Sequence, residues 1–225
     1  MMLLEFIAHA TFVITLHDGR RILIDPYQGM SFQGRFNYPA FQTSADFVLI
    51  THEHLDHCYL GDISNIPVVV RHQWHDHGLS VHSVFAWHDR FGGTKFGGGV
   101  QMKIIEAEGL RIAHLGDVGE DLSDTQIKAL GKLDVLILPI GGFYTIDGDA
   151  AASLVQRLQV RTVIPCHYKT TLCDLPIEGP ERFLTHFKTQ ITCLNQNSML
   201  LGTQPEGIVV MRDKWHIHAP ALCTA

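Results

Sequence analysis

The sequence is short of basic residues and has no long apolar run. Lysine and arginine number 17 against 23 aspartates and glutamates, and the formal net charge of the 225 residues is −6. Nucleic-acid surfaces depend on cationic contacts to phosphates, so we expect no nucleic-acid partner. No cluster of Lys and Arg suggests a polybasic membrane anchor, and no apolar stretch approaches the roughly 20 residues that cross a bilayer. We therefore expect no membrane attachment.

The chain also lacks a CxxC pair and has an odd number of cysteines, five. An odd number of cysteines argues against a disulfide framework and predicts reduced thiols in a cytoplasmic protein. The opening residues 1–14 are apolar but lack a basic start and contain Glu5 and His9, so we interpret them as strands, not as a signal peptide. The five cysteines are Cys58, Cys166, Cys173, Cys193 and Cys223.

Histidine, by contrast, is abundant. The chain has 15 histidines in 225 residues, about three times the share of roughly 2% that we take as ordinary usage. They are spread along the chain, so a terminal tag does not explain them. Neutral imidazole is the commonest protein ligand for metals, and the excess therefore indicates metal chemistry.

The apolar pattern predicts one α/β domain over residues 1–225, with two packed sheets and helices outside. A long loop with five aromatic residues spans 26–45 and is expected to be an ordered flap, lining the pocket or forming an interface in a homo-oligomer. Predicted helices are 123–130, with Ser123 and Gln126 as a capping box, 149–158 and 181–188. Predicted strands are 3–8, 11–16, 20–25, 47–50, 68–70, 81–87, 100–106, 110–115, 134–140, 161–166, 208–211 and 215–218.

The strongest motif is HEHLDH at 52–57, directly after the apolar strand 47–50. If this segment stays extended, His52 and His54 point to the same side and suit one metal ion. If the chain then turns, Asp56 and His57 face a second ion nearby. One strand end thus supplies ligands to two metals, and loops at strand ends are where sites usually lie.

This motif matches the HxHxDH signature of the metallo-β-lactamase superfamily, which the rest of the chain resembles over about 1–212. AHATF (8–12) and ILIDP (22–26) resemble its opening strands, HLGD (114–117) its bridging aspartate segment, and PCHY (165–168) its last histidine. Within the superfamily the chain looks most like a stand-alone branch that includes L-ascorbate 6-phosphate lactonase. It departs from that branch at Phe143, where a histidine often follows the paired glycines.

The resemblance implies a four-layer αβ/βα sandwich of two mixed sheets, with two divalent metal ions at one edge. Zinc is favoured by the many histidines, with manganese, iron or nickel as alternatives. The implied ligands of the first metal are His52, His54 and His88, those of the second are Asp56, His57 and His167, and Asp117 bridges the two.

Other residues are candidates for contact with substrate or for orienting the ligands. Asp25 follows an apolar strand and is placed to orient a ligand histidine. His114 is either such a support or a core histidine, and His82 is a rival of His88. We interpret His72, His75 and His77 as the polar side of a surface helix or turn. The remaining candidates are His9, Tyr168 and Lys169.

The predicted function is a metal-dependent hydrolase acting on a small molecule. A metal-bridged hydroxide would attack an ester-type bond in a phosphodiester, a lactone or another ester, with Asp56 and Asp117 as the catalytic carboxylates. Two alternatives stay open: an iron-dependent oxidoreductase on the same fold, and a metal-binding protein without turnover.

Overall fold

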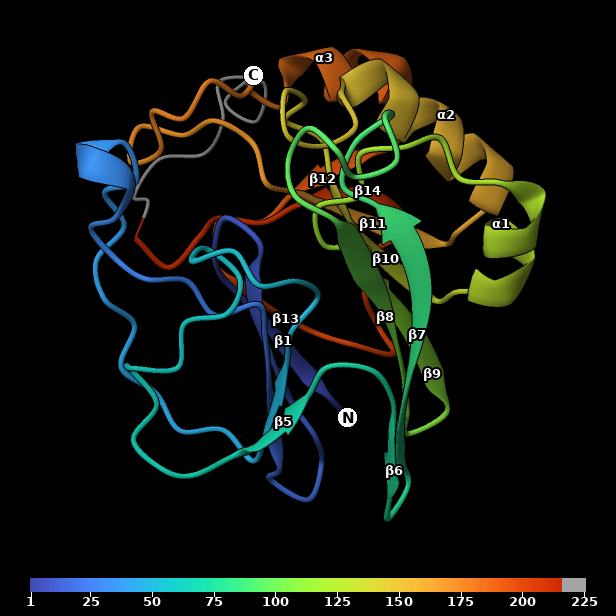
Figure 1. Cartoon of the computed structure of the whole chain (residues 1–225). Helices are drawn as coiled ribbons and strands as arrows, with labels where there is room; N and C mark the ends of the chain where they lie inside the picture. The colour runs from blue at the N-terminus through green and yellow to red at the C-terminus, as the bar shows by residue number, and fades with distance from the viewer. Residues whose placement is uncertain (216–225) are drawn as a thin grey trace.

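This computed structural model describes residues 1–215, which form two β-sheets packed against each other (Figure 1). The six-stranded sheet has the order β13-β1-β2-β3-β4-β5, and the eight-stranded sheet has the order β12-β14-β11-β10-β9-β8-β7-β6. The strands of the first sheet are β1 Leu3–Ala8, β2 Thr11–Thr15, β3 Arg21–Ile24, β4 Phe47–Leu49, β5 Val68–Val70 and β13 Ser198–Leu200. Those of the second are β6 Trp74–Asp76, β7 Leu79–Trp87, β8 Gly99–Ala107, β9 Leu110–His114, β10 Val135–Pro139, β11 Thr162–Cys166, β12 Ile191–Cys193 and β14 Gly207–Val210.

Both sheets contain antiparallel and parallel strand pairs. In the first, β1, β2 and β3 run antiparallel, and β4 and β5 then add in parallel. In the second, β7, β8 and β9 run antiparallel, whereas β10, β11 and β14 are parallel to their neighbours. Every residue of β10 and β11 is buried, which is why these strands are continuous apolar runs.

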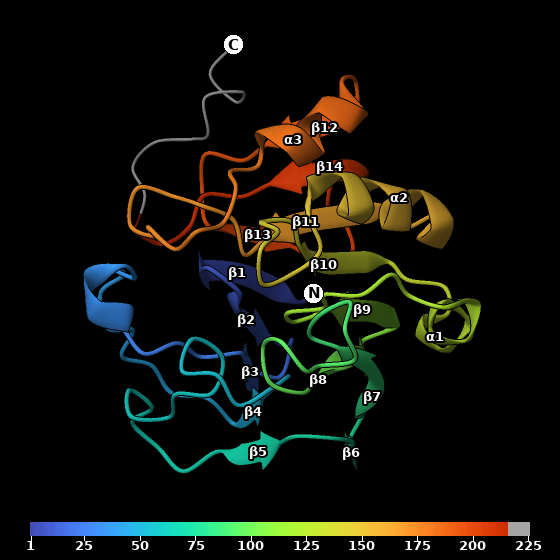
Figure 2. The ribbon, with the colours of Figure 1, turned by 45° about the horizontal axis from the view of Figure 1, so that its top comes forward.

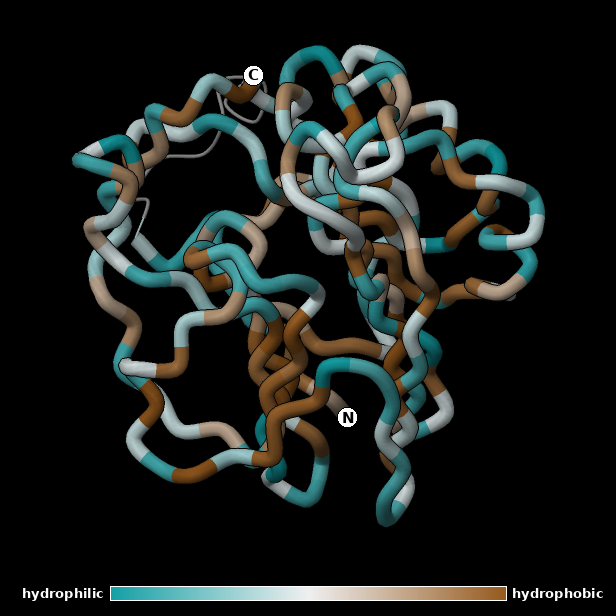
Figure 3. Tube along the Cα trace, in the orientation of Figure 1, coloured by the Kyte–Doolittle hydropathy of each residue, from teal (hydrophilic) through white to brown (hydrophobic). Residues whose placement is uncertain are grey.

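The main core lies between the sheets. Phe12, Ile24 and Leu49 of the six-stranded sheet pack in one cluster with Ile105 and Ile137 of the eight-stranded sheet. Figure 3 shows the strands as the most hydrophobic parts of the chain and the connecting loops as more hydrophilic. Each such side chain stabilises the fold by about 1.5–3 kcal/mol through burial.

The two outer faces are covered differently. Helices α1 (Asp124–Leu130), α2 (Gly148–Leu158) and α3 (Glu181–Leu184) cover the outer face of the eight-stranded sheet (Figure 2). Over the six-stranded sheet, the loop 26–45 packs its aromatic side chains on the strands and includes one short 3-10 turn, η1 (Phe32–Gly34). This arrangement confirms the mixed two-sheet sandwich and places the long aromatic loop against the six-stranded sheet.

The helix ends follow the predicted signals. Ser123 caps α1 in a capping box with Gln126, and Asp147 caps α2 by accepting a hydrogen bond from the backbone N–H of Ala150. The third helix is shorter than the predicted 181–188, because it tightens after Leu184 into the 3-10 turn η2 (Thr185–Phe187).

Three predictions about local structure were wrong or incomplete. Of the predicted closing strand 215–218, residues 216–218 lie outside the described residues, and Trp215 lies in a turn. Strand β14 pairs with β11 and β12. Strands β6, β12 and β13 were not predicted, since each has only three residues, too few to show an apolar pattern. Cys193 is disulfide-bonded, which corrects the expectation of reduced thiols throughout, while Cys58, Cys166 and Cys173 are free.

Within residues 1–215, no helix combines the length and the apolar character needed to cross a membrane.

Candidate metal centre

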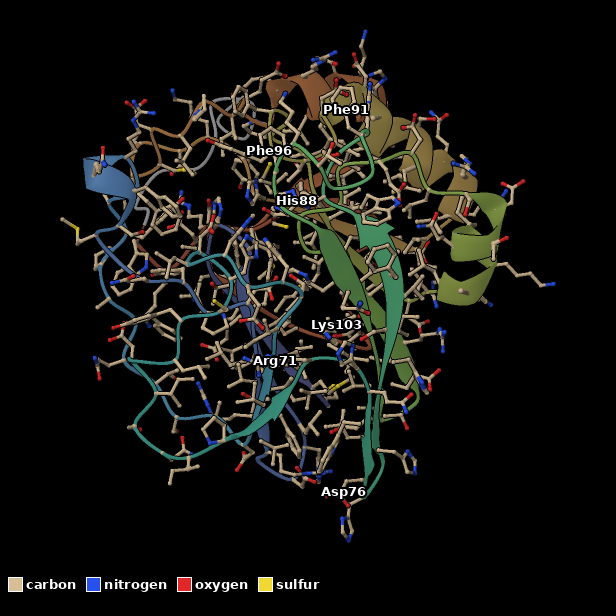
Figure 4. The ribbon with its side chains drawn as sticks, viewed as in Figure 1. Arg71, Asp76, His88, Phe91, Phe96 and Lys103 are labelled. Carbon is tan, nitrogen blue, oxygen red and sulfur yellow. The ribbon has the colours of Figure 1, made fainter. Side chains whose placement is uncertain are left out.

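The predicted ligands gather at one edge of the sandwich, where several strands end. HEHLDH follows β4 of the six-stranded sheet, while His88, Asp117 and His167 follow β7, β9 and β11 of the eight-stranded sheet. In Figure 4, His88 lies at this edge and Asp76 lies at the opposite end of the molecule, at the tip of the β6–β7 hairpin. The site therefore draws ligands from both sheets.

The structure brings all seven predicted ligands into two adjacent clusters. In each cluster the potential ligand atoms all lie within 4.8 Å of one another. Each cluster contains one of the two sets of three that the resemblance implied, together with Asp117 in the first cluster and His9 in the second. The first cluster is His52, His54, His88 and Asp117, and the second is His9, Asp56, His57 and His167.

Asp117 lies between the two clusters. Its Oδ2 is 3.5 Å from Nε2 of His88 in the first cluster and 3.2 Å from Nε2 of His167 in the second. Its Oδ1 is 3.1 Å from Nε2 of His57. One carboxylate thus reaches both clusters, which is the geometry that a bridging ligand requires.

Several buried polar atoms in these clusters are unsatisfied. Nε2 of His57, Nε2 of His88 and Oδ1 of Asp117 have no hydrogen-bond partner within the described chain. Leaving such an atom buried without a partner costs about 1–3 kcal/mol. Imidazole nitrogens and carboxylate oxygens facing one another are the donor set that binds divalent metals. The residues present therefore fit metal ions at both clusters.

Supporting groups hold two of the imidazoles in one orientation. Nδ1–H of His57 donates to Oδ2 of Asp25 at 2.9 Å, and Nδ1–H of His88 donates to the carbonyl of Tyr144 at 3.0 Å. Each bond fixes the ring so that Nε2 is directed at its cluster, where it can bind a metal ion once it has lost its proton. Asp25 is itself fixed by the backbone N–H and the hydroxyl of Thr51, at 2.8 and 2.7 Å.

The electrostatics of the centre favour a cation. Burial lowers the pKa of His57, but the carboxylates of Asp117, Asp56 and Asp25 outweigh it, so that pKa lies well above its ordinary value. Burial raises the pKa of Asp117, yet the charges on His167 and His57 bring it well below the ordinary range. The negative charge of three buried carboxylates around His57 is therefore not fully balanced by the imidazole. Bound divalent ions would supply the missing positive charge.

Comparison with known proteins shows the family. The sequence profile of the beta-lactamase superfamily domain matches residues 3–167 of this chain. The chain belongs to this superfamily. A UPF0173 metal-dependent hydrolase of Pyrococcus abyssi is 30% identical over 199 residues, covering 76% of this chain and 86% of the relative. One from Pelotomaculum thermopropionicum is 31% identical over 200 residues, covering 75% of this chain and 85% of the relative.

A solved structure from Thermotoga maritima, described as a candidate Zn-dependent hydrolase of the metallo-beta-lactamase superfamily, has the same fold. Its TM-score is 0.76 at 26% identity, covering 94% of this chain and 98% of that one. The predicted superfamily and fold are thus confirmed, and the chain is a metal-dependent hydrolase. The particular resemblance to the lactonase stays a prediction.

His9 lies deeper in the centre of this hydrolase than its sequence suggested. Its Nε2 is 3.2 Å from Oδ2 of Asp56, its ring centroid is 3.9 Å from that of His167, and its side chain is fully buried. Burial and the neighbouring His167 lower the pKa of His9 to about 4. The sequence offered only the resemblance of AHATF as a signal, because the approach of β1 to the second cluster depends on the tertiary fold.

The remaining candidates lie outside both clusters. His114 donates from Nε2 to the carbonyl of Ala10 at 2.9 Å, in the core beneath the site. Tyr168 packs in the core under the helices, and Lys169 pairs with Asp174 at 2.9 Å. His82 is exposed on β7 and lies 3.4 Å from Glu106, so it does not compete with His88.

His72, His75 and His77 belong to neither metal cluster, although His72 lines the same cavity as His52 and His54. His75 belongs to strand β6 and His77 to the turn of the β6–β7 hairpin, so the prediction of a surface helix or turn is corrected to a strand and its turn. Two contributors to the centre were missed from the sequence. They are the Thr51 hydroxyl, which donates to Asp25, and the Tyr144 carbonyl, which accepts from His88. The second could not be predicted from residue type, because every residue has a backbone carbonyl.

Proposed function

We propose that this hydrolase binds two divalent metal ions, with zinc favoured, and cleaves an ester-type bond in a phosphodiester, a lactone or another ester. The observation that carries the proposal is the position of Asp117 between two histidine-rich clusters whose unsatisfied atoms face one another. Manganese, iron and nickel accept similar ligands, but a set dominated by imidazoles favours zinc.

His52, His54 and His88 would hold the first ion, and Asp56, His57 and His167 the second, with Asp117 shared. Divalent ions in such a site supply Lewis acidity and lower the pKa of a water molecule toward 7. Each set of three protein ligands would leave a position for water, as catalytic metal sites do.

The chain itself positions the reacting groups. Asp117 and Asp56 keep their carboxylates ionised, because the imidazoles around them outweigh burial, which raises the pKa of both groups. Both can therefore accept or orient a proton of the attacking water. His9 holds Oδ2 of Asp56 at 3.2 Å and so limits the rotation of that carboxylate.

The space around the centre suits a small molecule. One cavity of about 190 Å³ touches the first cluster at His88, and another of about 310 Å³ touches it at His52 and His54. Small-molecule sites measure about 300–1,000 Å³, and these volumes are at or below the lower end. We therefore propose a small molecule as the substrate. We also propose that the chain forms a single domain.

The test combines metal analysis with turnover. Zinc-loaded and manganese-loaded protein would be assayed on bis-p-nitrophenyl phosphate, a matched carboxyl ester and a lactone, with and without chelator. We expect two ions per chain and turnover of at least one substrate that disappears with chelator. One ion per chain would contradict the two-metal site. Iron in the purified protein, with no ester turnover, would favour the oxidoreductase alternative.

Asp117→Ala tests the bridging role directly. This variant should lose activity by at least about 100-fold and bind less metal while keeping its circular dichroism spectrum. His82→Ala is the matched control, since that exposed histidine lies outside both clusters and should change neither property. Full metal content and full activity in Asp117→Ala would overturn the proposed centre.

A further inference from the structure

A cavity of about 190 Å³ adjoins the metal centre at His88. It lies between two loops, residues 89–98 after β7 and residues 141–147 after β10. Figure 4 shows Phe96 and Phe91 beyond His88, at the same edge of the molecule. A group attached to a bond held at the first cluster would therefore lie next to this cavity.

The cavity has an aromatic wall. The ring of Phe96 lies 5.1 Å from that of Tyr144 and 5.8 Å from that of Phe143, and the rings of Phe143 and Tyr144 are 4.7 Å apart. The same wall continues to the metal centre, because the ring of Phe96 is 6.1 Å from that of His88. Such spacings suit the stacking of a further ring.

Phe143 occupies this wall at a cost to the fold. Its backbone has a φ of +58°, a left-handed conformation that costs a residue other than glycine about 1–3 kcal/mol. Its side chain is 57% exposed, so the ring gains little from the core in return. Phe91, also at the cavity, is 66% exposed. Exposed rings in strained backbone beside a reactive centre are typical of ligand contacts.

The free charge at the cavity is positive. Nζ of Lys95 lies 4.8 Å from the centre of the Phe96 ring, and neither Lys95 nor Arg90 forms an ion pair within residues 1–215. The acids at the cavity are already engaged. Asp89 accepts four backbone hydrogen bonds from its own loop, and Asp147 caps α2 and lies 3.5 Å from Arg182.

We infer that this cavity binds an aromatic ring bearing a carboxylate, as one side of the ester that the metal centre cleaves. The ring would stack on Phe96 and Phe143, and the carboxylate would face Lys95 and Arg90. An apolar cavity of about 150 Å³ accepts one benzene ring, so 190 Å³ holds a ring with one substituent. The reaction at this site rests on the proposed function, whereas the binding does not.

The test is therefore a binding measurement on the purified protein with its bound metal. Phenylacetate, phenylacetamide and acetate would each be titrated by calorimetry. Phenylacetate should bind at least about 10-fold more tightly than either of the others, since only it has both ring and charge. Phe143→Ala and Lys95→Gln should each weaken phenylacetate by about 5–10-fold. Phe85→Ala and Lys128→Gln, at exposed positions outside the cavity, are the matched controls and should bind like the unchanged protein.

The outcomes separate this inference from the proposed function. Acetate binding as well as phenylacetate, with no effect of Phe143→Ala, would mean direct carboxylate binding to the metal and would overturn the inference. Absence of phenylacetate binding would overturn it too. If the expected binding pattern is found but no ester is turned over, only the hydrolytic proposal is contradicted. If esters are turned over at rates that do not depend on an aromatic ring or a carboxylate in the substrate, only the inference is contradicted.

Discussion

At the scale of single residues, Asp25 links the fold to the metal centre. Its carboxylate is fully buried and accepts from the backbone and hydroxyl of Thr51 and from Nδ1 of His57, at 2.7–2.9 Å. Burial raises its pKa, but the positive charge on His57 outweighs burial, so the group stays ionised. Asp25 does not belong to either cluster, yet it sets the orientation and basicity of a ligand.

Asp25→Asn should weaken metal binding at the second cluster by about 10–100-fold, because a neutral amide orients His57 less firmly and makes its Nε2 less basic. Affinity would be measured by competition with a chromophoric chelator, and folding by circular dichroism. Asp18→Asn, which alters an exposed carboxylate paired with Arg20, is the control. Equal affinity in Asp25→Asn and in the unchanged protein would show that the hydrogen bond does not tune the site.

Lys103 is a buried cation between the sheets, and it makes stability depend on pH. Its amine donates to the Arg71 carbonyl and to the Ser83 hydroxyl, and burial lowers its pKa from 10.5 to about 8. Figure 4 shows Lys103 close to Arg71. Below pH 8 the amine is protonated in the folded and the unfolded chain. Between pH 8 and 10.5 only the unfolded chain keeps the proton, so this group makes folding more favourable as pH rises.

We therefore expect the stability difference between the unchanged protein and Lys103→Met to shift in favour of the unchanged protein from pH 8 to pH 10. The slope should not exceed about 1.4 kcal/mol per pH unit. Urea unfolding of both proteins at pH 8, 9 and 10 measures it, with the exposed Lys128→Met as control. Parallel stability profiles for Lys103→Met and the unchanged protein would show that the amine does not titrate in this range.

At the scale of elements, the loops after the strands carry the site, and close backbone contacts hold them together. Gly119, two residues after Asp117, lies against the backbone of His88: a Cβ there would be 2.3 Å from the His88 carbonyl oxygen. Its N–H donates to the Trp87 carbonyl at 3.0 Å. The loop after β9 and the loop after β7 therefore touch where both supply ligands to the first cluster.

Gly119→Ala should displace His88, destabilise the fold by about 1–3 kcal/mol and reduce metal binding at the first cluster. Gly78→Ala is a useful comparison, because that glycine has a φ of +81° and no atom within 4 Å of the added Cβ, so it carries backbone strain alone. Urea unfolding and chelator competition would be measured for both. If Gly119→Ala binds metal as tightly as Gly78→Ala, the contact is not needed to place His88.

Elements with a long apolar pattern could be predicted from the sequence, and so could the ligands next to them. The apolar run 47–50 predicts a strand, and this strand places HEHLDH directly after its end. Ser123 predicts the start of α1. Strands β6 and β12 could not be predicted, since their three residues pair with partners that supply most of the burial. The position of His9 could not be predicted either, because it depends on a contact with Asp56, which is 47 residues away in the sequence.

At the scale of the molecule, the metal centre joins the two sheets. HEHLDH belongs to the six-stranded sheet, and His88, Asp117 and His167 belong to the eight-stranded one. Each cluster takes ligands from both, so neither sheet alone presents a complete site. An unfolded chain does not bring these ligands together, and metal binding therefore favours the folded state with both sheets docked.

Metal removal should accordingly lower the melting temperature of the whole protein and not only its activity. A ligand at 100 times its Kd stabilises the native state by about 2.7 kcal/mol, which corresponds to roughly 5–10 °C for a chain of this size. Differential scanning calorimetry of metal-loaded and chelated protein measures the shift. Asp117→Asn should show a smaller shift, because its amide reaches both clusters but binds metal weakly, and His82→Ala should show the full shift. If loaded and chelated protein melt at the same temperature, the clusters do not couple metal binding to the docking of the sheets.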